Sequence, residues 1–115
     1  MIVVDARSTV APFEQVRSQL AAQIADGTLV VGTKLPTVRS LADELGLAVN
    51  TVARAYRELE TSGLVETRGR AGTVVTSAGD RVRADVAAAA RVFAKAVHDS
   101  GLDTDSALRI VRAAL

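Results

Sequence analysis

Four polar residues lie at helical spacing near the middle of the chain: Asn50, Thr51, Arg54 and Arg57. Amide and hydroxyl groups can hydrogen-bond to the edges of nucleic-acid bases or to phosphates, and an arginine can offer a guanidinium fork to guanine or a phosphate. On a helix these residues lie opposite an apolar seam that runs from Val52 to Leu59 and includes Tyr56, which we expect in the core. The alternative is an ordinary amphipathic helix on which Arg54 pairs with Glu58 one turn further on.

A first helix is expected upstream of these residues. Pro12 suits a first helical position, and apolar residues then recur at helical spacing over roughly 13–26. The next stretch, GTLVVGTKLP (27–36), contains two glycines and a proline. These residues exclude a helix, so we expect a loop there.

Two further helices follow this loop. Thr37 is a natural N-cap for a short second helix that ends at Gly46. After residues 46–48, a third helix is expected over roughly 49–62, with Gly63 as its stop. Two helices joined by so short a turn form a helix-turn-helix.

The residues after the third helix predict a β-hairpin. The segments LVET (64–67) and TVVT (73–76) are rich in β-branched residues and bracket RGRAG (68–72), whose glycines can supply the positive φ of a turn. A helix-turn-helix followed by a hairpin is a winged helix. Its third helix is placed to enter a major groove of DNA, and its hairpin tip lies over the adjacent backbone or minor groove.

Positive charge is concentrated at the predicted wing tip. Arg68 and Arg70 flank Gly69, and cationic side chains beside a narrow groove are favoured electrostatically. The alternative is a pair of solvated surface arginines. Gly69 and Gly72 are expected to serve backbone conformation and close approach rather than base recognition.

The stretch from Gly32 to Val75, GTKLPTVRSLADELGLAVNTVARAYRELETSGLVETRGRAGTVV, resembles the DNA-binding domain of the GntR family of bacterial transcriptional regulators. The resemblance covers residues 12–76, and its diagnostic pieces are LP-x-x-R-x-LA (35–42), NTVARAYRELE (50–60) and GLVETRGRAGT (63–73). The Y-REL variant and the short C-terminal tail resemble the YtrA-like subfamily, which has a short helical tail in place of a large effector domain.

The resemblance implies DNA contacts for particular side chains. Arg39 occupies the arginine of LP-x-x-R and is expected to contact a phosphate and sometimes a base, the alternative being a solvated arginine. Thr37 is expected to cap its helix and so to aim backbone N–H groups toward a phosphate. The expected DNA-binding set is Lys34, Thr37, Arg39, Asn50, Thr51, Arg54, Arg57, Arg68, Gly69 and Arg70.

The chain departs from the family pattern in two places. Ala48 stands where members usually have Ser, Thr or Asn, and Val49 stands where they often have Arg or Pro. Ala48 cannot cap the third helix with its side chain, a loss of roughly 0.5–2 kcal/mol unless another group substitutes. The wing arginine also lies one residue earlier than in most relatives. The operator sequence therefore cannot be predicted from these residues.

The tail after SAGD (77–80) predicts two helices, one ending near Ser100-Gly101 and one beginning near Thr104 or Asp105. Its apolar seam packs either on the first helix or, as we prefer, on a second copy, because a long helix with one apolar seam needs a partner surface. The expected homodimer interface is Val82, Val86, Ala89, Phe93, Val97, Leu108, Val111 and Leu115. A two-fold dimer would bind a palindromic operator with half-sites about one helical turn apart.

The expected fold is therefore mainly α with a small β-hairpin: a winged helix-turn-helix DNA-binding domain over residues 1–76 and a two-helix dimerisation tail over 77–115. The apolar fraction of 49% and charged fraction of 23% are typical of soluble globular proteins. The absence of cysteine fits a reducing cytoplasm, and neither a signal peptide nor a membrane-spanning apolar run is recognisable. We expect a cytoplasmic protein without a membrane partner.

The residue inventory argues against an enzyme. His98 is the only histidine, and no histidine pair, cysteine or nucleotide-binding loop accompanies it, so we expect no cofactor and no metal. A winged helix used only for protein interaction is the main rival, although Arg39, Arg54 and Arg70 count against it. Family analogy implies a repressor. Whether a small-molecule effector binds stays open, since its pocket would need roughly 300 Å³ or more.

Overall fold

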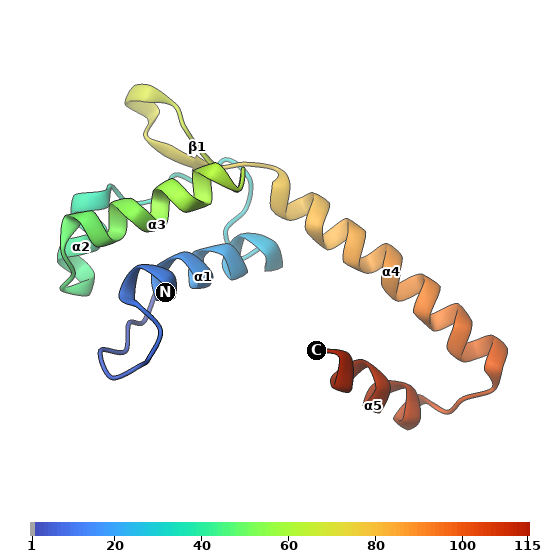
Figure 1. Cartoon of the computed structure of the whole chain (residues 1–115). Helices are drawn as coiled ribbons and strands as arrows, with labels where there is room; N and C mark the ends of the chain where they lie inside the picture. The colour runs from blue at the N-terminus through green and yellow to red at the C-terminus, as the bar shows by residue number, and fades with distance from the viewer. Residues whose placement is uncertain (1) are drawn as a thin grey trace. The chain divides into compact units, whose positions relative to one another are not determined.

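The computed structural model describes residues 2–115, and these residues form five α-helices and one two-stranded antiparallel sheet (Figure 1). The elements in chain order are α1 (Pro12–Asp26), α2 (Val38–Leu45), α3 (Val49–Thr61), β1 (Val65–Thr67), a 3-10 turn η1 (Gly69–Ala71), β2 (Thr73–Val75), α4 (Ala78–Ser100) and α5 (Thr104–Ala114). The chain divides into two compact units, one ending at Arg83 and the other covering Ala84–Leu115. The predicted class, a winged helix-turn-helix with a small hairpin and two tail helices, is confirmed.

Aliphatic side chains from α1, α2 and α3 form the core of the first unit, in which both α1 and α2 pack against α3. Val16, Val52 and Leu59 are completely buried. Tyr56 is 6% exposed, as expected for a core residue, and its hydroxyl donates a 2.7 Å hydrogen bond to the carbonyl oxygen of Pro36. This bond joins α3 to the chain just before α2 and removes the cost of an unpaired buried hydroxyl.

The helix-turn-helix forms as the sequence predicts. Thr37 caps α2, since its Oγ1 accepts a hydrogen bond of 3.1 Å from the backbone nitrogen of Ser40. Gly46 ends α2 with a left-handed φ of 67°. Ala48 precedes α3 without a side-chain cap, and no other side chain in the described chain replaces it. The first backbone N–H groups of α3 are therefore left to solvent or to a ligand.

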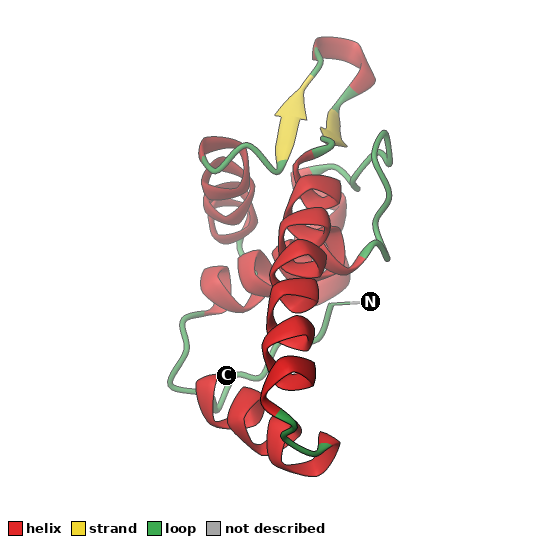
Figure 2. Ribbon diagram, turned by 90° about the vertical axis from the view of Figure 1, so that its right-hand side faces the viewer, coloured by secondary structure: helices red, strands yellow, loops and turns green. Residues whose placement is uncertain are grey.

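The wing contains one more extended segment than the sequence predicts. β1 and β2 pair antiparallel with Val65 opposite Val75, and the 3-10 turn forms their tip (Figure 2, strands in yellow). Residues 33–35 lie along the other edge of β2, where Lys34 forms an isolated bridge with Val74. This stretch was expected only as a loop, because a segment that forms a single bridge does not show the alternation of apolar and polar residues that identifies a strand. The positive φ expected at the wing glycines is confirmed, at 53° for Gly69 and 78° for Gly72.

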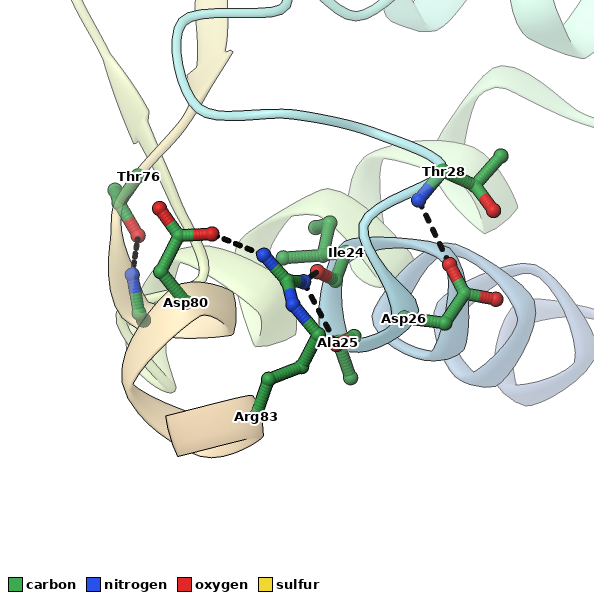
Figure 3. A network of polar contacts seen from close by, with 8 residues as sticks. Ile24, Ala25, Asp26, Thr28, Thr76, Asp80 and Arg83 are labelled. Atoms are coloured by element: carbon green, nitrogen blue, oxygen red, sulfur yellow. Dashed lines mark hydrogen bonds and ion pairs between the residues drawn. The ribbon is translucent and has the colours of Figure 1, made fainter. Parts of the chain in front are cut away.

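Helix α4 begins at Ala78, which corrects the expectation that the tail helix follows residues 77–80. Arg83, near the start of α4, donates from Nη1 to the carbonyl oxygens of Ile24 and Ala25 at 3.1 and 2.8 Å and forms an ion pair with Asp80 (Figure 3). The first turns of α4 therefore belong to the first unit and close the C-terminal end of α1. The functional boundary at residue 76 stays a prediction.

Two glutamines on α1 hold the segment that precedes it. Gln15 is buried, accepts a hydrogen bond of 2.7 Å from the backbone nitrogen of Asp5, and donates to the carbonyl oxygens of Asp5 and Val10. Gln19 pairs in the same two-way manner with the backbone of Val3. The two side-chain amides thus bind the backbone of this segment in the way that a neighbouring strand would.

The second unit consists of the remainder of α4 and of α5, which are joined by residues 101–103. Ala107 is the one buried residue in this described unit. Several of the predicted interface residues are open to solvent in the single chain, with exposed fractions of 43% for Val82, 64% for Val86, 45% for Leu108 and 99% for Leu115. Ala89 is exposed as well, and Phe93, Val97 and Val111 are half-buried.

Candidate nucleic-acid interface

The residues expected to bind DNA all lie in the first unit, on the start of α2, on α3, on the wing and on the segment before α2. All of them are exposed except Thr51, which is half-buried. The structure therefore places the complete set on the surface of one compact unit, as a contact with a large external ligand requires.

The outer face of α3 carries Asn50 and Arg57, opposite the buried seam that contains Val52 and Leu59. These two polar residues are two helical turns apart, so they point in nearly the same direction. Both are exposed, and neither side chain has a hydrogen bond or an ion pair among residues 2–115. Their donors and acceptors are free to bind an external partner.

Arg54 lies on the side of α3 that faces α1. Its guanidinium carbon is 3.6 Å from the centre of the Phe13 ring, in the first turn of α1. A planar cation over an aromatic face is attracted by the electrons of the ring. The alternative pairing of Arg54 with Glu58 is absent from the described chain, where Arg54 stacks on Phe13 instead.

Two acids and one more arginine surround this stack. Glu14 is ion-paired with Arg17, whose hydrogen bond is the main cause that lowers the pKa of Glu14, while Arg54 adds a smaller electrostatic contribution. The same bond, chiefly, raises the pKa of Arg17, and Glu58 adds to it at longer range. Glu58 is half-buried, and its Oε2 has no hydrogen-bond partner in the described residues.

The start of α2 presents Arg39 to solvent at the second position of the helix, two residues after the Thr37 cap. Lys34 lies beside the wing, and its side chain covers Gly72: a Cβ at that glycine would lie 3.0 Å from Lys34 Cε. The glycine thus makes room for the lysine stem as well as for the turn. This contact links the segment before α2 to the wing.

The two wing arginines differ in their surroundings. Arg68 forms an ion pair with Glu66 on β1, so part of its hydrogen-bonding capacity is used within the chain. Arg70, in the 3-10 turn, is exposed and has no ion pair or side-chain hydrogen bond within residues 2–115. Arg70 is therefore the cation at the wing tip whose donors are all available.

Sequence reasoning missed Phe13 and Arg17 as neighbours of the candidate interface, and it considered Glu58 only as an ion-pair partner of Arg54. Phe13 was assigned only to the apolar positions of the first helix, and its contact with Arg54 joins residues from two different helices. The helical spacing of Glu14 and Arg17 was the one available signal, because residues three apart lie on one face.

No helix within residues 2–115 is long and apolar enough to cross a membrane. In the same part of the chain, no group of three or more histidine, aspartate and glutamate side chains is arranged to hold a metal ion.

The comparisons with known proteins agree with this architecture. The model of the family described as "Bacterial regulatory proteins, gntR family" matches residues 12–75. The HTH-type transcriptional regulator Rv1152 of Mycobacterium tuberculosis is 47% identical over 106 residues, which are 92% of this chain and 87% of that protein. The HTH-type transcriptional repressor YtrA of Bacillus subtilis is 43% identical over 77 residues, which are 66% of this chain and 58% of that protein.

Among solved structures, YtrA from Sulfolobus acidocaldarius, a GntR-family transcription factor, superimposes with a TM-score of 0.62 at 32% identity, covering 78% of this chain and 97% of that one. These relatives are transcriptional regulators rather than enzymes, and the YtrA-type resemblance is thereby confirmed. With the family model matched from α1 to the end of the wing, the chain belongs to the gntR family of bacterial regulatory proteins and is a transcriptional regulator.

Proposed function

We propose that this regulator binds a specific sequence in double-stranded DNA as a homodimer and represses transcription from it. The observation that carries the proposal is the outer face of α3, where Asn50 and Arg57 are exposed, point the same way and lack partners within the described chain. A helix of this kind can read base edges when it enters the major groove. Arg39 on α2 and Arg70 on the wing are candidates for phosphate contacts.

Residues 1–76 would form the DNA-binding domain and residues 77–115 the dimerisation tail. The second unit supports a partner copy because it has a single buried residue, Ala107, and exposes the apolar side chains of Val86, Ile110 and Leu115. A unit this small and this poorly buried is not expected to be stable without further apolar contact. Two-fold pairing of the tails would present two copies of α3 to a palindromic operator.

The repressor role rests on the YtrA relative, which is named as a repressor. A protein that acts on bacterial DNA works in the cytoplasm, which we propose as its location.

A small-molecule effector is compatible with an open groove of about 500 Å³ in the second unit, lined by Phe93, Val97, His98 and Leu108 among others. Grooves of this volume accommodate small ligands.

The test is selection of binding sites from a random library of DNA duplexes, followed by measurement of affinity for the enriched duplex and for a scrambled one. We expect an enriched palindrome that is bound tightly, with the preference lost in Arg57→Ala and the affinity for both duplexes lowered in Arg39→Ala. Arg91→Ala, an exposed arginine on α4, is the matched control and should bind normally. Equal, weak binding to both duplexes by the wild type would support the rival interaction module instead.

Dimerisation is tested separately by sedimentation equilibrium. Val86→Glu places a charge in the proposed interface and should give a monomer, whereas Ala88→Glu, on the opposite face of α4, should stay dimeric. A wild-type chain that is monomeric at micromolar concentration would contradict the proposed dimer.

A further inference from the structure

The stack of Arg54 on Phe13 gives this arginine a different position from the other polar residues of α3. Asn50 and Arg57 point in nearly the same direction, whereas Arg54 is turned by about 40–60° from them around the helix axis, toward α1. The contact of 3.6 Å with the Phe13 ring holds the guanidinium at this edge. Arg54 therefore lies beside the face of α3 that would enter a groove, not at its centre.

The hydrogen-bond donors of Arg54 remain available. Its side chain has no hydrogen bond or ion pair in the described chain, and the contact with the aromatic ring uses none of its N–H groups. Stacking thus fixes the plane of the cation without using any donor. A guanidinium held in this way is preorganised to bind a phosphate, whose oxygens can accept two parallel hydrogen bonds from its N–H groups.

The charges around the stack leave Arg54 as the outward-facing cation. Glu14, Arg17 and Glu58 are all half-buried, and Glu14 and Arg17 neutralise each other in an ion pair. Arg54 is the exposed member of this cluster. Glu58 carries the remaining negative charge, one turn further along α3.

We propose that Phe13 is a positioning residue that holds Arg54 at the edge of α3, where Arg54 clamps one phosphate of the DNA backbone and supplies affinity independent of sequence. The bases are then read by the central residues Asn50 and Arg57. This inference rests on the proposed function, since it requires α3 to enter a groove. It assigns Arg54 to the backbone rather than to guanine, and it gives an aromatic residue of α1 a role in DNA binding.

The experiment measures affinity for the selected duplex and for its scrambled counterpart over a range of salt concentrations. For Arg54→Ala we expect a loss of about tenfold for both duplexes. The slope of log affinity against log salt should fall by about one, and the ratio between the two duplexes should stay unchanged. Phe13→Leu keeps an apolar side chain but removes the ring, so it should cause a smaller loss of the same kind. Phe13→Tyr keeps the ring and should restore the wild-type slope.

Other outcomes have distinct meanings. A fall in the ratio between the duplexes for Arg54→Ala, with an unchanged salt slope, would show that Arg54 reads a base and would overturn the phosphate clamp. An effect of Arg54→Ala without any effect of Phe13→Leu in a folded protein would overturn the positioning role of Phe13. If the wild type prefers no sequence but Arg54→Ala still lowers the salt slope, the proposed function fails and the clamp stands. No binding to any duplex overturns both.

Discussion

Gly79 and Ile24 are in such close contact that a Cβ atom on Gly79 would lie 2.3 Å from the carbonyl oxygen of Ile24. The contact presses the first turn of α4 against the last turn of α1. Only glycine allows this approach, because the obstructing atom belongs to the backbone and cannot move as the end of a flexible side chain does. The start of α4 is therefore part of the packing of the first unit.

The Gly79→Ala substitution should destabilise the protein by about 1–3 kcal/mol, since the added methyl group overpacks a rigid contact. The direction is opposite to the usual rule for helices, in which alanine is better than glycine by up to about 1 kcal/mol. Urea unfolding monitored by circular dichroism measures the difference. The control is Ala88→Gly at an exposed position of the same helix, where glycine should be the destabilising residue. Increased stability of Gly79→Ala would contradict the contact.

Arg83→Ala should lower the unfolding free energy by about 1–2 kcal/mol, because two carbonyl oxygens at the end of α1 lose their donor. Arg83→Lys should recover only part of the loss, since an ammonium group cannot reproduce the fork that spans Ile24, Ala25 and Asp80. Arg81→Ala, an exposed neighbour, is the matched control. Equal unfolding midpoints for Arg83→Ala and Arg81→Ala would exclude this role.

Much of the fold could be predicted because it depends on local patterns. The helical period of the seam in α3, the Thr37 cap and the positive φ of Gly46 each follow from residues close together in the chain. The start of α4 was predicted too late, because Gly79 resembles a helix breaker unless Ile24 is known to lie against it. The bond from Arg83 to Ile24 joins residues 59 positions apart, and no local pattern reveals such a pairing.

The candidate interface was likewise predictable by residue type but not by arrangement. The sequence identifies Arg54, Arg68 and Arg70 as cations near a groove-binding helix and a wing. It does not show that Arg54 stacks on Phe13 or that Arg68 is ion-paired, because both depend on side-chain geometry in the folded chain. These contacts distinguish three arginines that the sequence treats alike.

Stability should fall at high pH through Tyr56. Burial raises the pKa of Tyr56 to about 12, above the value of about 10 for an unfolded tyrosine. Between these values the unfolded chain loses the phenolic proton while the native chain retains it, so the native state binds more protons and its stability decreases as pH rises. The stabilising contribution is complete below pH about 10 and is lost as the pH approaches 12.

The titration is directly observable, because Tyr56 is the only tyrosine and the chain has no tryptophan. Near-ultraviolet absorbance should report a higher pKa in the native protein than in urea. Tyr56→Phe removes this signal and the hydrogen bond to Pro36, which should cost about 1 kcal/mol at neutral pH. Identical titration curves in the native and unfolded states would contradict the burial argument.

Arg70→Ala should weaken DNA binding more than Arg68→Ala, although the two residues flank the same glycine. Arg70 has no partner in the described chain, so its whole charge is available to a phosphate, whereas Arg68 is held by Glu66. Removing one phosphate contact should lower the salt slope by about one for Arg70→Ala. For Arg68→Ala the change should be smaller, because Glu66 already neutralises part of the charge of Arg68 in the wild type.

The substitution Glu66→Gln isolates the effect of this ion pair. It frees Arg68 and removes a negative charge from the wing, so affinity and salt slope should both rise above the wild-type values. The double variant Glu66→Gln with Arg68→Ala should lose the gain in slope. Equal losses from Arg70→Ala and Arg68→Ala, together with no effect of Glu66→Gln, would mean that the ion pair opens on DNA binding and does not decide which wing arginine makes the contact.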